Sequence, residues 1–201
     1  MICQVDDIVR RVRMAMARGR SPRPLIRCRD PDAVDLDRVI MSKIGQGVER
    51  IYREAPLDRL METMLDFSAQ GVCWHTPVDS TWSGHVLLPD DFLRLAVFEM
   101  SDWAVPVFDP VDCRSPRYRL IGSRYSGLRG SPSRPVVALA DMPQGRVLEF
   151  HACGSDACHI SAAAYCPLPR IDGYGGIDIA AGLLDDITDS IAALVSATIG
   201  E

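Results

Sequence analysis

Hydrophobic residues near the N-terminus recur every three or four positions, the spacing that gathers them on one face of a helix. In the first such segment these positions are Val5, Ile8, Val9, Val12 and Met16. We expect this helix to end before Gly19 and the proline-containing stretch 21–24, because glycine and proline disfavour a helix interior. In the second segment the positions are Leu36, Ile40, Ile44, Val48 and Ile51. Asp35 is the expected N-cap of the second helix, and Pro56 requires it to end by Ala55.

The C-terminal segment gives the clearest helical pattern. Its apolar face consists of Ile179, Leu183, Ile187, Ile191, Leu194, Val195 and Thr198. Asp178 is the expected N-cap of this last helix, and a shorter helix is expected within residues 57–67. Gly45 and Gly47 lie inside the second helix, where each costs about 1 kcal/mol relative to alanine. Close packing of a neighbouring helix would explain these two glycines.

From Gly71 the pattern changes to the two-residue alternation that is typical of β-strands. Residues 72–78 and 82–87 predict a β-hairpin. The further expected strands are 135–140, 146–152 and 160–166. Proline, glycine and arginine recur through residues 106–135, which predicts a long loop or weakly paired strands.

Residues 87–95 (LLPDDFLRL) fit two structures. Pro89 followed by two aspartates is a helix-start signal, whereas the apolar run from Phe92 is typical of a strand. The preceding hairpin, together with Trp103 and Pro106, favours the strand. The expected faces of this strand are Phe92, Arg94, Ala96 and Phe98 on one side and Leu93, Leu95 and Val97 on the other. Apolar side chains on both faces predict a strand that is buried on both sides.

These elements predict an α+β protein in which helices from the N- and C-terminal segments form a helical bundle around a central antiparallel β insertion. The N-terminal helical part covers residues 1–70. The β-rich insertion with its arginine-rich loop covers 71–170, and the C-terminal helix of 171–201 packs back on the helical part. We expect these parts to make one domain overall, since 201 residues suit a single domain with an insertion.

Charge is distributed unevenly along the chain, although the total is modest. The net charge of −5 does not indicate a nucleic-acid-binding protein. Eight arginines and no acidic residue lie between Asp7 and Asp30, and six lie between Asp112 and Asp141. The candidate contacts with a partner or with DNA are Arg114, Arg117, Arg119, Arg124 and Arg129. A solvated surface loop is the alternative for this segment, and codon usage is an alternative reason for 21 arginines beside the single Lys43.

The seven cysteines are irregularly spaced, and the N-terminal segment lacks the pattern of a signal peptide. We therefore expect reduced thiols in a soluble intracellular protein without a membrane partner. Cys153, Cys158, His159 and Cys166 form the best candidate group for metal or thiol chemistry. Their spacing departs from that of structural zinc sites, which usually combine two tight pairs of ligands, so scattered buried thiols are the favoured interpretation.

Other motifs of catalysis are not found in the sequence. It contains no phosphate-binding P-loop, no dinucleotide fingerprint and no Gly-x-Ser-x-Gly nucleophile turn. The stretch 173–176 (GYGG) reads better as a turn before the last helix. We therefore expect no catalytic residue, no metal and no cofactor, and a protein that is not an enzyme.

The order of these features resembles the head–tail connector, or adaptor, proteins of tailed bacteriophages. The stretches that carry the resemblance are 54–56 (EAP), 84–95 (GHVLLPDDFLRL) leading to Trp103, 134–139 (RPVVAL) with 148–150 (LEF), and 166–167 (CP) with 192–195 (AALV). Together they span nearly the whole chain, and 89–95 is the most specific of them.

The resemblance implies a structural virion protein that forms a ring, typically of twelve copies, beneath the portal and around the DNA channel. It implies the portal protein and the tail or stopper proteins as partners, with phage DNA passing nearby without specific recognition. The protein would be found in the neck of the virion and, during assembly, in the host cytoplasm. Two alternatives stay open: a small intracellular metal- or thiol-dependent enzyme that uses the group of Cys153, Cys158, His159 and Cys166, and a nucleic-acid-binding module that uses the arginine-rich stretches.

Overall fold

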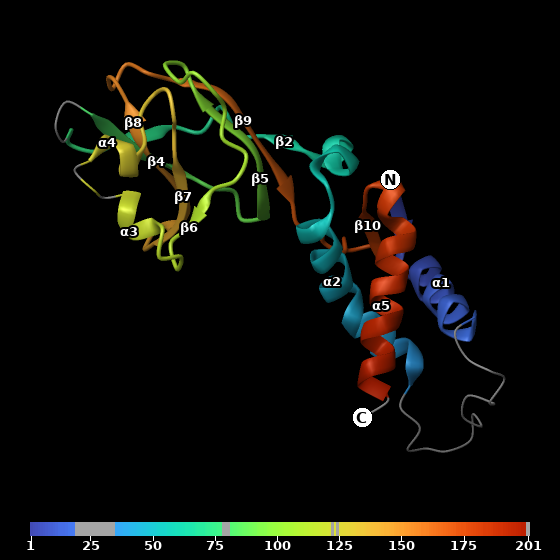
Figure 1. Cartoon of the computed structure of the whole chain (residues 1–201). Helices are drawn as coiled ribbons and strands as arrows, with labels where there is room; N and C mark the ends of the chain where they lie inside the picture. Colours follow the sequence, from blue (N-terminus) through green and yellow to red (C-terminus); the bar gives the residue numbers. More distant parts are fainter. Residues whose placement is uncertain (19–34, 78–80, 122, 124, 200–201) are drawn as a thin grey trace. The chain divides into compact units, whose positions relative to one another are not determined.

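The computed structural model describes residues 1–18, 35–77, 81–121, 123 and 125–199. It is an α+β structure with helices toward both ends of the chain and antiparallel sheets between them (Figure 1). The chain divides into two compact units, Met1–Thr63 with Leu168–Glu201 and Met64–Pro167. We call them the helical unit and the β unit. Their boundaries fall seven and three residues before the expected changes after residues 70 and 170, and the expectation of one domain overall stays a prediction.

The helical unit is built on three α-helices whose apolar faces are buried against one another. The helices are α1 (Val5–Arg18), α2 (Leu36–Glu54) and α5 (Leu184–Ile199), with 3-10 helices at Leu57–Thr63 and Ala181–Leu183. Ile8, Ile44 and Ile191 on the three helices are all fully buried. Gly47 lies where α2 meets α5, because a Cβ at this position would overlap Cγ1 of Ile191. The expected close packing is confirmed for Gly47, whereas Gly45 has open space beside it.

The ends of α2 follow the sequence signals. The Asp35 carboxylate accepts a hydrogen bond from the backbone N–H of Asp37 at 3.1 Å, as an N-cap does. Ala55 donates its N–H to the carbonyl of Ile51 at 2.8 Å, and Pro56 ends the helix. The short helix expected within 57–67 is a 3-10 helix that stops at Thr63, whose hydroxyl donates to the carbonyl of Leu60.

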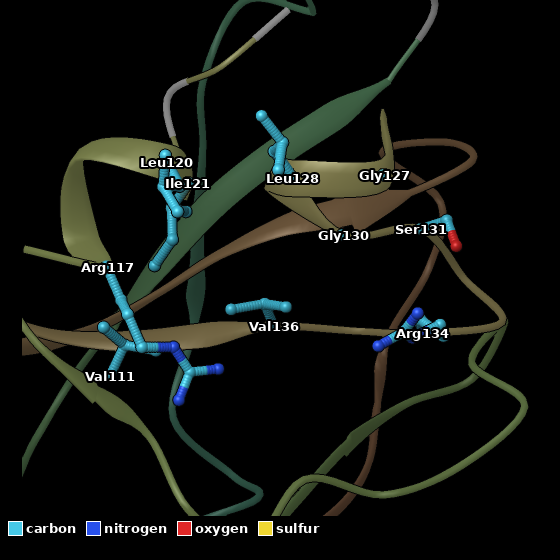
Figure 2. Close-up of a pocket in the computed structure, with 10 residues that line it drawn as sticks. All are labelled: Val111, Arg117, Leu120, Ile121, Gly127, Leu128, Gly130, Ser131, Arg134 and Val136. Carbon is cyan, nitrogen blue, oxygen red and sulfur yellow. The ribbon is translucent and has the colours of Figure 1, made fainter. Parts of the chain in front are cut away.

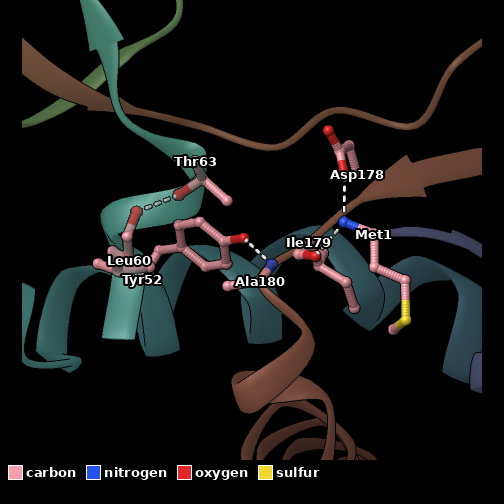
Figure 3. Close-up of polar contacts among 7 residues, drawn as sticks. All are labelled: Met1, Tyr52, Leu60, Thr63, Asp178, Ile179 and Ala180. Atoms are coloured by element: carbon pink, nitrogen blue, oxygen red, sulfur yellow. Dashed lines mark hydrogen bonds and ion pairs between the residues drawn. The ribbon is translucent and has the colours of Figure 1, made fainter. Parts of the chain in front are cut away.

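A short two-stranded sheet joins the N-terminal segment to the stretch before α5. Strand β1 (Ile2–Gln4) pairs antiparallel with β10 (Gly176–Asp178). The amino group of Met1 donates to Asp178 and to the carbonyl of Ile179, as Figure 3 shows. Asp178 as N-cap of the last helix was a wrong prediction, because the residue is in this strand and α5 starts only at Leu184.

The β unit contains a three-stranded sheet, β2-β9-β5, and a five-stranded sheet, β3-β4-β8-β7-β6. The strands are β2 (Leu65–Asp66), β3 (Val72–Trp74), β4 (Trp82–Leu87), β5 (Phe92–Met100), β6 (Val111–Asp112), β7 (Val137–Met142), β8 (Gly145–Cys153) and β9 (Ile160–Pro167). The pairs are antiparallel except for the two-residue parallel contact of β6 with β7. The expected hairpin and the three later strands are confirmed.

Strand β5 settles the ambiguity of LLPDDFLRL in favour of a strand. Bulges interrupt its pairing with β9, so the strict alternation of faces expected for it was wrong. Its side chains are nevertheless buried or partly buried along the whole length, as a strand covered on both sides requires. Phe98 of β5 packs on Phe150 of β8, with ring centroids 6.0 Å apart, and both contact Trp103. The two sheets therefore share one aromatic core.

The segment expected as a long loop is more ordered than its proline and glycine content indicates. It holds β6 and two short helices, α3 (Tyr118–Ile121) and α4 (Ser126–Arg129). Ser115 and Ser123 accept hydrogen bonds from backbone N–H groups two residues later, which starts the turn before each helix. Among all described residues, no helix has both the length and the apolar character needed to cross a membrane.

Candidate functional site: an arginine-lined pocket and a histidine-rich sheet

A pocket of about 310 Å³ lies beside α3 and α4 in the β unit (Figure 2). Its apolar lining comes from both short helices and from the strand segments beneath them, and its polar atoms come mainly from Arg117 and Arg134. Leu120 and Leu128 line it as well, yet nearly half of each residue's surface is exposed. Apolar surface beside arginine is typical of sites that bind another protein.

The exposed arginines of this segment that the structure describes have no acidic partner within the described part of the chain. Among the described residues, no carboxylate lies within ion-pair distance of Arg114, Arg117, Arg119 or Arg134. The helical unit behaves differently, because seven of its arginines make such pairs. These are Arg10, Arg11, Arg13, Arg38, Arg50, Arg53 and Arg59. The arginine-rich segment therefore presents positive charge that the described part of the chain does not neutralise.

The five predicted contact arginines do not share one environment. Arg114, Arg117 and Arg119 are exposed. Arg129 is buried, with 9% of its surface exposed, and it donates a hydrogen bond to the hydroxyl of Thr81 at 2.8 Å. Arg124 lies outside the described residues, as do several arginines of the N-terminal stretch. Arg134, which was not among the five, lines the pocket and belongs with the exposed group.

A polar network occupies the five-stranded sheet near this pocket. His75 and His85 on the β3–β4 hairpin approach each other to 2.8 Å between Nε2 and Nδ1. His85 lies opposite Glu149 in the pairing of β4 with β8. Glu149 is itself buried and accepts a hydrogen bond of 2.5 Å from the hydroxyl of Tyr118. Strand alternation could have placed His85 and Glu149 in the sheet, but their pairing depends on the register of β4 on β8, and the two residues are 64 positions apart in the sequence.

Burial and hydrogen bonding shift the pKa values of Tyr118, His85 and His151 in the directions that favour their neutral forms. The hydrogen bond to Glu149, aided by burial, raises the pKa of Tyr118 to about 12. Burial lowers the pKa of His85, and the neighbouring His75 lowers it further. Burial is also the main cause that lowers the pKa of His151. Neutral imidazoles that accept and donate within a sheet suit a structural role.

The cysteine group expected from the sequence is only partly assembled. Cys153 and Cys158 come together, and Asp102 joins them. His159 is exposed at the start of β9, and Cys166 is buried opposite Arg94. Asp102 could not be found from cysteine spacing, because it follows β5 and lies more than 50 residues before Cys153.

Comparison with known proteins adds no family to these observations. No protein-family model matches the sequence, and no curated protein matches it either.

Proposed function

We propose that the chain is a structural subunit of the head–tail connector of a tailed bacteriophage, and not an enzyme. The observation that supports this best is the division of the chain. Segments from both ends form one compact helical unit, and the segment between them forms a β unit of its own. In this proposal α1, α2 and α5 act as the helical bundle of a ring wall, and the β unit is an insertion that reaches neighbouring components.

The proposed assembly is a ring of identical subunits, of twelve copies by analogy with the connector family. Head-to-tail contacts between identical chains close into a ring when the rotation from one copy to the next permits it. The ring would sit beneath the portal protein, with tail or stopper proteins on its other side and DNA passing through it. This places the protein in the virion neck, and in the host cytoplasm during assembly.

The arginine-lined pocket supplies one half of the proposed contact between copies. Its unpaired arginines and exposed leucines need a partner that offers both acidic and apolar groups. The helical unit carries exposed carboxylates that make no ion pair among the described residues. They are Asp6, Asp58, Glu62, Asp172 and Asp189. We therefore assign the pocket to the helical unit of the next subunit.

Light scattering after size-exclusion chromatography, with electron microscopy of the same sample, tests the assembly. We expect rings from the purified chain, or from the chain mixed with the portal protein of the same phage. Arg117→Glu combined with Arg134→Glu should abolish them. Arg38→Glu is the matched control, since Arg38 is an exposed arginine of the helical unit that pairs with Asp35 and with no other carboxylate among the described residues. A chain that stays monomeric and does not bind the portal protein would refute the proposal.

A binding assay with duplex DNA separates the nucleic-acid alternative from the proposal. If the arginines serve DNA, affinity should fall steeply as salt is raised, and the double substitution should remove DNA binding. Rings that form equally well in the double variant, together with such salt-dependent binding, would replace the proposed contact by a DNA-binding role.

A further inference from the structure

Asp102, Cys153 and Cys158 form a cluster of metal-ligand atoms in the β unit. A carboxylate oxygen of Asp102 and the two sulfur atoms all lie within 4.8 Å of one another. Asp102 follows β5, Cys153 ends β8, and Cys158 lies in the connection between β8 and β9. Cys153 is buried, whereas Cys158 and Asp102 are partly exposed, so solvent can reach one side of the cluster.

Backbone and side-chain hydrogen bonds join the segment 101–103, which contains Asp102, to the segment 152–159, which contains both cysteines. Gly154 donates its N–H to Oδ2 of Asp102 at 2.7 Å. Ser101 donates its N–H to the carbonyl of His159 at 2.9 Å, and its hydroxyl accepts the N–H of His159 at 3.2 Å. The indole of Trp103 donates to the carbonyl of Ala152 at 3.0 Å. The ligand atoms are thus held in place by strands and turns and do not depend on a free loop.

One oxygen of Asp102 is left for a ligand. Oδ2 is oriented by the N–H of Gly154, while Oδ1 is buried and has no conventional hydrogen-bond partner among the described residues. A buried carboxylate oxygen without a partner is costly, and such atoms commonly belong to binding sites. The thiol of Cys153 is a polar group beside Asp102. Three groups that all carry negative charge when deprotonated therefore lie close together, with Cys153 buried and Asp102 and Cys158 partly exposed.

We propose that Asp102, Cys153 and Cys158 bind a thiophilic divalent cation of the zinc class. Two thiolates and one carboxylate favour such an ion over calcium or magnesium, which prefer sets of oxygen ligands. The fourth position of a tetrahedral site would face solvent. Each thiol that becomes a ligand releases one proton to the solvent, so binding weakens as the pH falls. The bound ion would tie the end of β5 to the β8–β9 connection, and this role does not depend on the proposed connector function.

Titration of the reduced, metal-free protein with Co²⁺ tests the site directly, because cobalt bound by thiolates gives a near-ultraviolet charge-transfer band. We expect saturation at one equivalent per chain, loss of the band when Zn²⁺ is added, and a higher melting temperature with zinc. Asp102→Asn and Cys158→Ser should each weaken cobalt binding at least about tenfold, in line with the loss of a ligand. Circular dichroism shows whether each variant is folded.

Cys73→Ser is the matched control, since Cys73 is an exposed cysteine of the same unit outside the cluster. It should bind cobalt as the unchanged chain does. The proposal is overturned if no charge-transfer band appears in the reduced protein, or if folded Cys158→Ser keeps the full affinity. Unchanged cobalt affinity in folded Asp102→Asn would also reject it, because the carboxylate would then not be a ligand. Quantitative thiol labelling before titration ensures that a disulfide between Cys153 and Cys158 does not mimic an absent site.

Discussion

Replacing Gly47 with alanine tests the contact between α2 and α5. An added Cβ would lie closer than 3.0 Å to Cγ1 of Ile191, and Ile191 is fully buried, so it has no free space to move into. Overpacking of this kind costs about 1–3 kcal/mol. Alanine returns about 1 kcal/mol through its better helix propensity. We therefore expect Gly47→Ala to change the free energy of unfolding by between about zero and 2 kcal/mol in the destabilising direction.

Gly45→Ala is the control, because Gly45 lies on the same helix and has no atom within 4 Å of the added Cβ. It should stabilise the helical unit by about 1 kcal/mol. Both substitutions make the same gain in helix propensity, so the difference between them, about 1–3 kcal/mol, isolates the contact with Ile191. In an Ile191→Ala background this difference should largely disappear.

Urea unfolding followed by far-ultraviolet circular dichroism measures these changes through the helices. Tryptophan fluorescence reports separately on the β unit, which contains all three tryptophans, Trp74, Trp82 and Trp103. The variants at residues 45 and 47 should shift the helical signal. If Gly47→Ala stabilised the protein as much as Gly45→Ala, the close approach of α2 and α5 at this point would be refuted.

Three further substitutions test the β unit. Tyr118→Phe removes the donor to the buried Glu149 and should cost about 1–3 kcal/mol in urea unfolding, with no loss if the hydrogen bond is absent. Trp103→Phe leaves the buried carbonyl of Ala152 without its donor and should lower the free energy of unfolding by about 1–3 kcal/mol. Trp82→Phe is the control, because it makes the same change of side chain without removing this hydrogen bond. His151→Gln should reduce the decrease in the free energy of unfolding that occurs as the pH is lowered. The folded pKa of His151 lies below its usual value of 6.5, so its contribution is complete above about pH 6.5 and falls as the pH drops further; an unchanged pH profile would contradict this.

Local signals in the sequence were enough for most elements of the fold. Asp35 and Pro56 set the ends of α2 because a cap and a proline act on their own backbone. The strand at Phe92 was predicted from its apolar run, from the hairpin before it and from Trp103 and Pro106 after it. Asp178 was misassigned because a cap signal close to a helical pattern does not exclude a strand, and here β1 supplies the pairing partner from the other end of the chain. Pairing between distant segments of this kind cannot be recognised from the hydrophobic periodicity of the sequence.

The candidate sites were harder to predict for the same reason. Cys153 and Cys158 lie close in sequence, but Asp102 joins them only through the turn after β5, and neither His159 nor Cys166 completes the group. The network of His85 and Glu149 likewise needs the register of β4 on β8. Sequence spacing identifies ligands from one segment, whereas a site built across a sheet depends on which strands become neighbours.

The arginines of the two units differ in their ion pairs, which the composition of the chain does not reveal. Codon usage can explain why the chain has 21 arginines and one lysine, but it acts equally on both units. Seven arginines of the helical unit pair with carboxylates, whereas Arg114, Arg117, Arg119 and Arg134 of the β unit pair with none in the described part of the chain. Surface ion pairs contribute little to stability, so the missing pairs cost the β unit little. Unneutralised guanidinium groups beside exposed leucines therefore contribute more to binding a partner than to the stability of the fold. For this reason the proposed contact between subunits is placed at this pocket.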